Sequence, residues 1–343
     1  MAYTTIDNPG LFFNTVLYTG ANKSITGVNF QPDWVWIKER DSGYHAIFDS
    51  IRGVTKILSS NVANAESTQS DTLTAFGTDG FTLGADSSNY VGGSSTNTVS
   101  WNWKANGTGS SNSDGSISST VSVNTTAGFS IVSYTGNGSQ PSTVGHGLGA
   151  IPEVVLVKPR SVAYSWCMYH KSTGNTHLLY LDTTGAASSF SVWNSTSPTS
   201  SVFTVNDNQV NKSGETHIAY CFKEIKGYSK FGSYTGNGNA DGTFIHTGFR
   251  PAMIIAKETS EARDWQIWDD KRLGYNASGG NKNLVPNDSD AEDTYADIDI
   301  LSNGFKLRST SSAHNKSSQT YMYMAFAGAP FVTEGTKAAG TAR

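Results

Sequence analysis

Acidic side chains beside aromatic residues are the first candidates for chemistry in this sequence. Asp49 and Asp269 each follow an aromatic residue, and His170 stands at the matching position in the middle of the chain. Glycoside hydrolysis needs two carboxyl groups about 5–10 Å apart across one cleft. Because only one acid recurs, and His170 replaces it once, we expect these residues to bond the backbone of a turn at a strand end.

A second group of acids lies in the last third of the chain. Four of them fall within residues 288–293, and Asp297 and Asp299 alternate with isoleucines just beyond. Ca²⁺ binds several carboxylate and carbonyl oxygens, but the spacing of an EF-hand is missing. Solvated acids on a loop and a strand face are therefore the favoured interpretation. We expect no catalytic residue, no cofactor and no metal site, and leave open a single Ca²⁺ ion in this loop.

Basic and sulfur-containing residues also lack the spacing of a known site. Lys38, Lys158 and Lys257 each end an apolar run, which suggests either anion binding or a lysine stem lying on the edge of a core. The second interpretation is favoured. Cys167 and Cys221 have no metal-ligand spacing and fall within predicted strands, so we expect buried free thiols. The seven histidines are scattered.

All these residues belong to a sequence module that is repeated three times along the chain. Each copy carries five landmarks in the same order, and such duplication usually means duplicated architecture. A unit of this length can hold its own core, so we expect a string of three small domains. The landmarks are Tyr18, Tyr134 and Tyr234 of Tyr-Thr-Gly; the apolar runs Pro32–Lys38, Pro152–Lys158 and Pro251–Lys257; the pairs Phe48-Asp49, Tyr169-His170 and Trp268-Asp269; Phe81/Leu83, Phe203/Val205 and Phe305/Leu307; and Trp101/Trp103, Tyr220/Phe222 and Met324/Phe326.

The residue patterns predict strands almost throughout. Short continuous apolar runs such as Trp34–Ile37 indicate buried central strands. Trp101 and Trp103 alternate with a polar residue, which predicts one face on a core and the other face free. With roughly six to eight strands per copy, the predicted fold is all-β: three tandem β-sandwich (jelly-roll-like) modules with very little helix. The predicted structural core residues are Trp36, Trp103, Leu156, Phe222, Ile255 and Phe326.

The landmarks also set the predicted domain boundaries. Residues 105–127 are dominated by Gly, Ser, Thr and Asn, which indicates a flexible linker whose second half adds a strand to the next module. The join at residues 223–227 is short, so modules 2 and 3 should hold a fixed angle while module 1 is freer. The predicted boundaries are an N-terminal extension (1–9), module 1 (10–105), a linker (106–114), module 2 (115–226), module 3 (227–332) and a C-terminal tail (333–343).

Composition narrows the class of protein. Only 15% of residues are charged and the net charge is -4, which excludes a highly charged disordered chain and the basic surface of a nucleic-acid binder. No window approaches the roughly 18 apolar residues of a membrane span, and the first residues lack a secretory pattern. A polar but weakly charged surface suits contact with carbohydrate or with neighbouring protein copies.

Several strings resemble a repeat module of virion proteins from tailed bacteriophages. The resemblance covers nearly the whole chain and implies a structural protein of the particle, often described as a tail fibre or appendage. It brings no catalytic residues and no defined ligand site. The strings are AYTTID (2–7), VSYTGNG (132–138), VGHGLG (144–149), GYSKFGSYTGNG (227–238), LSNGFKLR (301–308) and MAFA (324–327) with Pro330-Phe331.

The resemblance and the missing catalytic pairs together predict a non-enzymatic virion protein, assembled in the cytoplasm of a host bacterium. The favoured function is a tail fibre or appendage component in host attachment or fibre anchoring; the alternative is a capsid decoration protein. Expected partners are other virion proteins, further copies of the chain (as a trimer), and a host-surface glycan or protein. Nucleic acid binding and membrane insertion are not expected.

Host contact, if it occurs, should use loops that lie outside the repeated landmarks. Residues 86–96 and 286–293 are rich in Ser, Asn and Asp and have no predicted role in a core. The candidate contact residues are Asp86, Asn89, Tyr90, Asn287 and Asp290.

Overall fold

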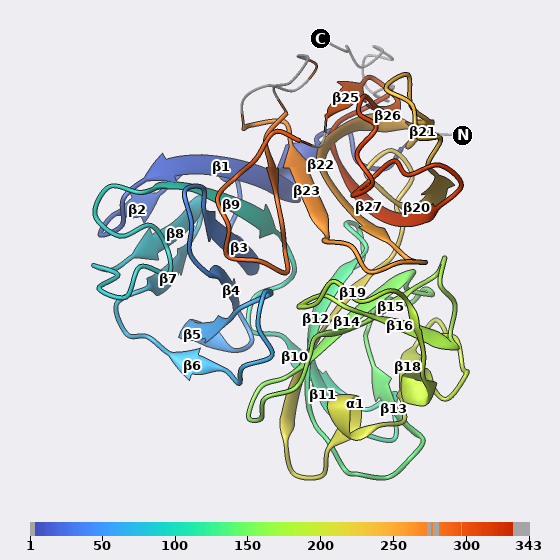
Figure 1. Cartoon of the computed structure of the whole chain (residues 1–343). Coiled ribbons are helices and arrows are strands. Elements are labelled where there is room, and N and C mark those ends of the chain that lie inside the picture. The colour runs from blue at the N-terminus through green and yellow to red at the C-terminus, as the bar shows by residue number, and fades with distance from the viewer. Residues whose placement is uncertain (1–3, 273–275, 277–280, 296, 332–343) are drawn as a thin grey trace.

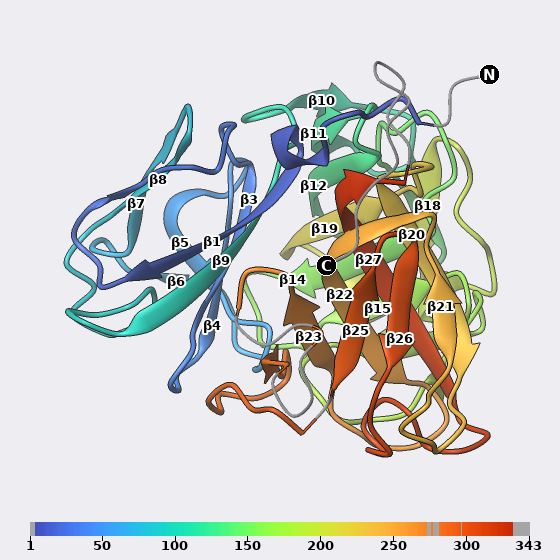
Figure 2. The same ribbon diagram turned by 90° about the horizontal axis from the view of Figure 1, so that it is seen from above.

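Three β-sandwich-like modules pack around a common centre in the computed structural model (Figure 1). The structure describes residues 4–272, 276, 281–295 and 297–331. The predicted C-terminal tail, 333–343, lies outside these residues. Turned by 90°, the strands of module 1 lie on one side and those of modules 2 and 3 on the other (Figure 2). The predicted all-β class is confirmed.

Module 1 follows a one-turn 3₁₀ helix, η1 (Pro9–Leu11). Its strands are β1 (Phe13–Thr19), β2 (Ser24–Ile25), β3 (Trp34–Glu39), β4 (His45–Asp49), β5 (Gly53–Leu58), β6 (Ser67–Thr68), β7 (Leu73–Gly77), β8 (Gly80–Leu83) and β9 (Asn97–Trp103). A six-stranded sheet has the order β1-β9-β3-β4-β5-β6, and a three-stranded sheet has the order β2-β8-β7. All pairings are antiparallel.

Module 2 has the largest sheet, with the order β10-β11-β12-β19-β14-β15-β16-β17, and a small sheet of β13 and β18. Its elements are β10 (Ser110–Asn112), β11 (Ser119–Asn124), β12 (Phe129–Thr135), β13 (Ser142–Gly145), β14 (Val154–Pro159), β15 (Cys167–His170), β16 (His177–Tyr180), β17 (Ser188–Ser189), η2 (Ser191–Trp193), β18 (Val202–Val205), α1 (Asn208–Asn211) and β19 (Thr216–Phe222). Cys167 and Cys221 are buried free thiols, as predicted.

Module 3 combines a five-stranded sheet, β20-β27-β22-β23-β24, with a three-stranded sheet, β21-β26-β25. Its strands are β20 (Ser229–Thr235), β21 (Phe244–His246), β22 (Phe249–Glu258), β23 (Gln266–Asp269), β24 (Asn283–Leu284), β25 (Ile298–Leu301), β26 (Gly304–Leu307) and β27 (Thr320–Pro330).

The same five-strand order recurs in all three modules: β1-β9-β3-β4-β5, β12-β19-β14-β15-β16 and β20-β27-β22-β23-β24. The registers match as well. Trp36 of β3 lies opposite Trp101, and Leu156 of β14 lies opposite Tyr220. In module 3, Ile255 of β22 pairs in the same way with a residue of β27. The repeated landmarks therefore mark repeated structure.

The segment predicted to be a flexible linker is instead held at several points. Its residues 110–112 form β10, which pairs with β11 of module 2. On the other side, the Asp33 carboxylate of module 1 accepts the N–H groups of Ala105 (2.7 Å) and Gly107 (3.0 Å). The expectation of a freer module 1 is therefore wrong, because the segment is bonded to a module at each end.

The central strands are buried on both faces, not on one. Every residue of β3 is buried, as is β9 from Thr98 to Trp103. Val35 and Ile37 pack between the two sheets of module 1, whereas Trp34 and Trp36 belong to a second core shared with the other modules. The predicted free face of the closing strands is thus occupied by neighbouring modules, which explains the uninterrupted apolar runs.

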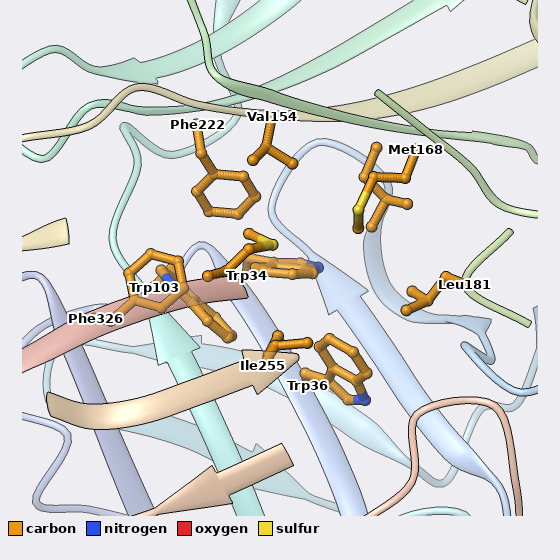
Figure 3. Close-up of a pocket in the computed structure, with 11 residues that line it drawn as sticks. Trp34, Trp36, Trp103, Val154, Met168, Leu181, Phe222, Ile255 and Phe326 are labelled. Carbon is orange, nitrogen blue, oxygen red and sulfur yellow. The ribbon is translucent and has the colours of Figure 1, made fainter. Parts of the chain in front are cut away.

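Aromatic rings from all three modules meet in this shared core (Figure 3). Trp34 stacks on Tyr220 of module 2 with ring centroids 4.6 Å apart. Phe326 of module 3 lies 5.4 Å from Trp103 and 5.7 Å from Phe222. Modules 1 and 2 each hold a core of their own, as expected, and all three modules in addition surround one common interior.

The tyrosine of each Tyr-Thr-Gly landmark fastens a loop of its own module. The Tyr18 hydroxyl donates to the carbonyl oxygen of Val91 (2.8 Å), and the Tyr134 hydroxyl donates to that of Val210 (2.6 Å). Tyr234 makes the corresponding bond in module 3. A polar group buried in a core needs such a partner, so the loop before the closing strand is tied to the first strand each time.

Truncation of Trp103, Phe222 or Phe326 to alanine should lower the free energy of unfolding by about 3–5 kcal/mol, as for large aromatics in packed interiors. All three are buried in the shared core, so each change should weaken one transition of the whole chain. Urea unfolding measures the effect, with the exposed Phe190→Ala as control. A core variant that unfolds at the parent urea concentration would contradict the shared core.

Candidate functional site

The three modules contact one another through the same bonds, repeated around the centre. At each junction a ring N–H donates to a carbonyl oxygen near the end of the fifth strand of the neighbouring module. The pairs are Trp166 Nε1 to Ser59 (2.8 Å), Trp265 Nε1 to Tyr180 (3.0 Å) and His45 Nε2 to Val285 (3.0 Å). Module 2 thus bonds module 1, module 3 bonds module 2, and module 1 bonds module 3. Because each module makes the same contact with the next, and the third contact leads back to the first module, the three modules form a closed ring with approximate threefold symmetry.

The tautomer of His45 follows from its neighbours. Trp36 Nε1 can only donate, and it lies 2.8 Å from His45 Nδ1. His45 Nδ1 is therefore the acceptor, and Nε2 carries the proton that is donated to Val285. Burial lowers the pKa of His45 well below its ordinary value, so the ring is neutral.

The recurring lysines are all buried, and two of them bond a neighbouring module. Lys38 Nζ donates to the Asp290 carbonyl oxygen of module 3 (3.0 Å), and Lys158 Nζ donates to that of Ala63 in module 1 (3.1 Å). Lys257 donates to the Glu258 carbonyl oxygen (2.6 Å). Burial lowers the pKa of all three to about 8. The predicted position on a core edge is corrected for Lys38 and Lys158, because a neighbouring module covers each ammonium group; Lys257 is also buried.

The recurring acids bond turns at strand ends, as predicted. Asp49 accepts the N–H groups of Ile51 (3.1 Å) and Arg52 (2.8 Å), and Asp269 does the same for the turn that follows it. His170 accepts the N–H of Ser172 through Nδ1 (3.1 Å).

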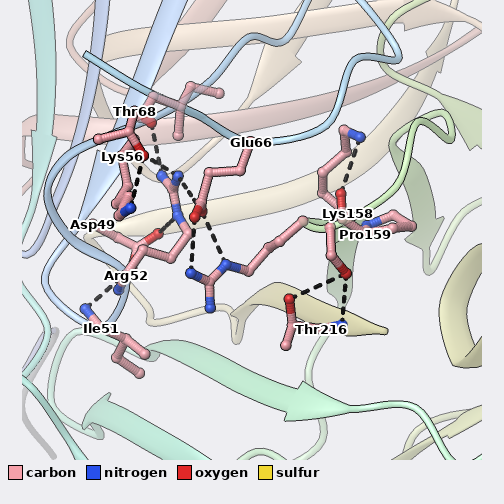
Figure 4. A network of polar contacts seen from close by, with 12 residues as sticks. Asp49, Ile51, Arg52, Lys56, Glu66, Thr68, Lys158, Pro159 and Thr216 are labelled. Atoms are coloured by element: carbon pink, nitrogen blue, oxygen red, sulfur yellow. Dashed lines mark hydrogen bonds and ion pairs between the residues drawn. The ribbon is translucent and has the colours of Figure 1, made fainter. Parts of the chain in front are cut away.

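Asp49 is also the centre of an ionic cluster at the junction of modules 1 and 2 (Figure 4). Its carboxylate accepts a bond from Arg52 and one from the Tyr220 hydroxyl of module 2 (2.7 Å). Arg52 also bonds Glu66 (3.2 Å). Glu66 in turn receives a two-pronged bond from Arg160 of module 2 (2.9 and 3.0 Å). The buried charges are thus paired and hydrogen-bonded, as burial requires.

The second junction repeats this cluster and the third replaces it with neutral groups. Between modules 1 and 3 the chain places Asp269, Arg272, Glu292, Arg40 and Trp101. Between modules 2 and 3 the matching positions hold His170, Thr173, Ala187, Thr259 and Met324. The backbone bond persists even there, from Ala187 N to Thr259 O (2.9 Å). All five positions therefore change together.

Glu66→Ala should destabilise the protein by about 1–3 kcal/mol, because two arginines lose a hydrogen-bonded counter-charge. Arg160→Thr should cost less, since its side chain is 19% exposed. The double variant recreates the Ala187/Thr259 pair of the third junction, so it should cost less than the sum of the two changes. A coupling of about 0.5–3 kcal/mol is expected in a double-mutant cycle of urea unfolding. Strictly additive effects would contradict a paired cluster.

The acid-rich loop 286–293, predicted as a contact loop, lies against module 1. Glu292 pairs with Arg40, and the Asp290 carbonyl oxygen accepts from Lys38, although the Asp290 side chain is exposed. Asn287 is an internal brace, because its side chain accepts the Trp265 N–H (2.9 Å). Across the described ranges, no three Asp, Glu, His or Cys side chains come together as metal ligands.

The other predicted contact loop, 86–96, is shaped from within. Asp86 is buried, and its carboxylate accepts the N–H groups of Tyr90 (2.8 Å), Val91 (2.7 Å) and Gly93 (3.0 Å). As a contact residue Asp86 is corrected: a buried carboxylate bonded to three amides cannot meet a partner. Asn89 is exposed, and Tyr90 is partly exposed.

Glu39 lies buried near the same loop, and one of its carboxylate oxygens has no hydrogen-bond partner within the described part of the chain. Burial, with the nearby charge of Asp86, raises the pKa of Glu39 to about 7. The folded state therefore favours the protonated carboxyl, and the stability that this form supplies is lost as pH rises through the folded pKa.

Replacement of Glu39 by Gln should remove this pH dependence. The variant should gain stability over the parent as pH rises from about 4.5 to 7, by roughly 1–2 kcal/mol, and the gain should then level off. Urea unfolding of both proteins at closely spaced pH values measures the difference. A difference that stays constant over this range would mean that Glu39 titrates normally.

A surface pocket of about 220 Å³ opens between loops of module 1, with Tyr44 and Tyr90 in its lining. Tyr44 is 48% exposed. Ser59, Asn64 and Ser67 contribute polar groups to the lining, and Ile57, Val62 and Ala65 complete it. Tyr90 lies in a contact loop predicted from the sequence. That prediction does not include Tyr44 or Asn64, although a tyrosine in a glycine-containing loop could have pointed to Tyr44.

The pocket is a feature of module 1 and not of the repeat. The backbone N–H groups of His45, Trp166 and Trp265 all bond a side chain from the segment after the fifth strand, which aligns the three modules. The residue before each is Tyr44, Ser165 and Asp264 respectively. Asp264 is already bonded to an asparagine. The position of Tyr44 is therefore aromatic in module 1 alone.

Comparison with known families places the whole ring in one unit. A family model described as a domain of unknown function (DUF7483) matches residues 8–330. The chain belongs to this family. Because the match spans all three modules, the family unit is the complete ring and not a single sandwich. No curated protein and no solved structure gives a significant match. Among the residues that the structure describes, no helix has the length and apolar character to cross a membrane.

Proposed function

We propose that this protein is a non-enzymatic structural component of a tailed-bacteriophage particle, acting in a tail fibre or appendage in host attachment or fibre anchoring. The observation that carries the proposal is the closed ring. Three modules share one interior and three matching junctions, while their outer loops differ. Such a body is a rigid support for variable surface loops, which is what an attachment protein needs.

The virion resemblance supports the same function from the sequence. Its strings are spread between residues 2 and 331, a span close to that of the family match at residues 8–330. Many copies of the protein on one particle would add weak contacts into firm attachment, so a single deep pocket is not required. The pocket beside Tyr44 and Tyr90 would then supply one such weak contact.

The approximate threefold symmetry also bears on assembly. A threefold partner, such as a trimeric fibre, can be matched by one copy on its axis or by three copies around it. We propose three copies around a fibre axis, with other virion proteins as neighbours. The mass of the purified protein by light scattering, and the number of copies per particle, distinguish the two assemblies.

Capsid decoration is the second candidate function, and the same symmetry favours it. A body with three similar modules fits a threefold position of a capsid surface. In that case the ring would stabilise the head by bridging neighbouring subunits, and host cells would not be contacted.

Immunogold labelling of purified particles should place the protein on the tail or its appendages. Purified protein should also adsorb to host cells and reduce infection by competing for the same surface. Even labelling of heads, without adsorption to cells, would favour decoration. Particles that carry none of the protein would overturn both candidates.

A further inference from the structure

We propose that the pocket between Tyr44 and Tyr90 binds a single neutral sugar residue of a surface saccharide. The inference names a ligand class for the candidate site, and it rests on the proposed function only for the origin of that saccharide.

The size of the pocket suits one sugar ring. Sites for drug-sized ligands measure about 300–1,000 Å³, so a pocket of about 220 Å³ accepts a smaller molecule. Tyr44 and Tyr90 are both part of its wall. A tyrosine ring offers a rigid apolar face with a polar tip, which matches a sugar: apolar C–H groups on the face of the ring and hydroxyls at its edge.

The lining carries no formal charge. Its residues are tyrosines, serines, an asparagine and small aliphatics, without Lys, Arg, Asp or Glu. The nearby Asp86 is turned inward onto three backbone amides. A phosphate or an acidic sugar would find no cation here, whereas a neutral polyhydroxyl compound needs none.

Polar groups in the lining are free to bond a ligand. Among the residues that the structure describes, the Tyr44 and Tyr90 hydroxyls and the side chains of Asn64 and Ser67 have no hydrogen-bond partner. Hydroxyls donate and accept, and an amide offers one of each kind of group. A sugar hydroxyl also does both, so it can pair with any of them.

The walls are fixed before any ligand arrives. Asp86 holds the Tyr90 backbone (2.8 Å), and Asn61 holds the His45 N–H beside Tyr44 (3.1 Å). The segment that carries Asn64 is bonded by module 2 on both sides. Lys158 binds Ala63 before it, and Arg160 binds Glu66 after it. Rigid walls reduce the entropy lost on binding, which favours affinity from a small contact.

Saturation-transfer NMR on the full chain tests the proposal. The neutral probes are the methyl glycosides of glucose, galactose, mannose and N-acetylglucosamine, and methyl glucuronide is the acidic probe. At least one neutral probe should bind with a dissociation constant on the order of 1 mM. Tyr44→Ala and Tyr90→Ala should each weaken its binding about tenfold or more, corresponding to loss of about 1.4 kcal/mol. Asn64→Ala should weaken it as well.

Phe190→Ala is the matched control, because this exposed aromatic lies in module 2 away from the pocket and should leave binding unchanged. Equal melting temperatures for the parent and the variants establish that the fold is kept. The proposal is overturned if no neutral probe binds, if the tyrosine variants bind as the parent does, or if the glucuronide binds more tightly. Particle labelling is separate: sugar binding by a protein missing from particles would overturn the proposed function alone.

Discussion

Burial of both faces of each large sheet is the constraint on which this structure depends. In a two-sheet sandwich, the outer face of each sheet is normally exposed to water. Here the outer face of every large sheet is turned toward the other two modules and carries Trp, Tyr, Phe or Met side chains. Removing one module would expose Trp34 and Trp103, or their counterparts, to solvent. The three modules therefore share one core, although modules 1 and 2 also have a separate apolar core between their own two sheets.

The polar architecture follows from this constraint. Loops that cross from one module to the next lie over a dry interior, so their polar groups must be satisfied there. Lys158 fastens such a loop through the carbonyl oxygen of Ala63, and Trp166 fastens it through that of Ser59. The recurring acids Asp49 and Asp269, which the sequence offers as candidates for acid–base chemistry, serve these junctions. Polar side chains of Tyr44, Asn64, Ser67 and Tyr90 that serve no junction line the surface pocket of module 1.

The sequence predicts the strands well because their landmarks recur with a period and a burial pattern. Apolar runs such as Trp34–Ile37 even indicate the shared core, because side chains on both faces of the strand are apolar, whereas a sandwich strand needs only one apolar face. The burial of Lys38 could not be predicted, because its partner carbonyl at Asp290 lies far along the chain. The burial of Asp86 could not be predicted either, because the sequence alone does not distinguish an aspartate that accepts bonds from buried amides from one that is solvated. Tyr90 was found by its loop, but its convergence with Asn64 depends on tertiary structure.

The neutral junction between modules 2 and 3 bears on how each module surface pairs with the correct partner. These two modules are joined by the short segment 223–227, so the chain itself keeps their surfaces at a high effective concentration. Modules 1 and 3 are not consecutive, and between modules 1 and 2 the recurring strands β9 and β12 are separated by residues 104–128, which include β10 and β11. Wrong pairings within or between chains are open to those two surfaces, and mismatched charges penalise them. Ionic selectivity is thus concentrated where covalent connection cannot by itself determine the partner.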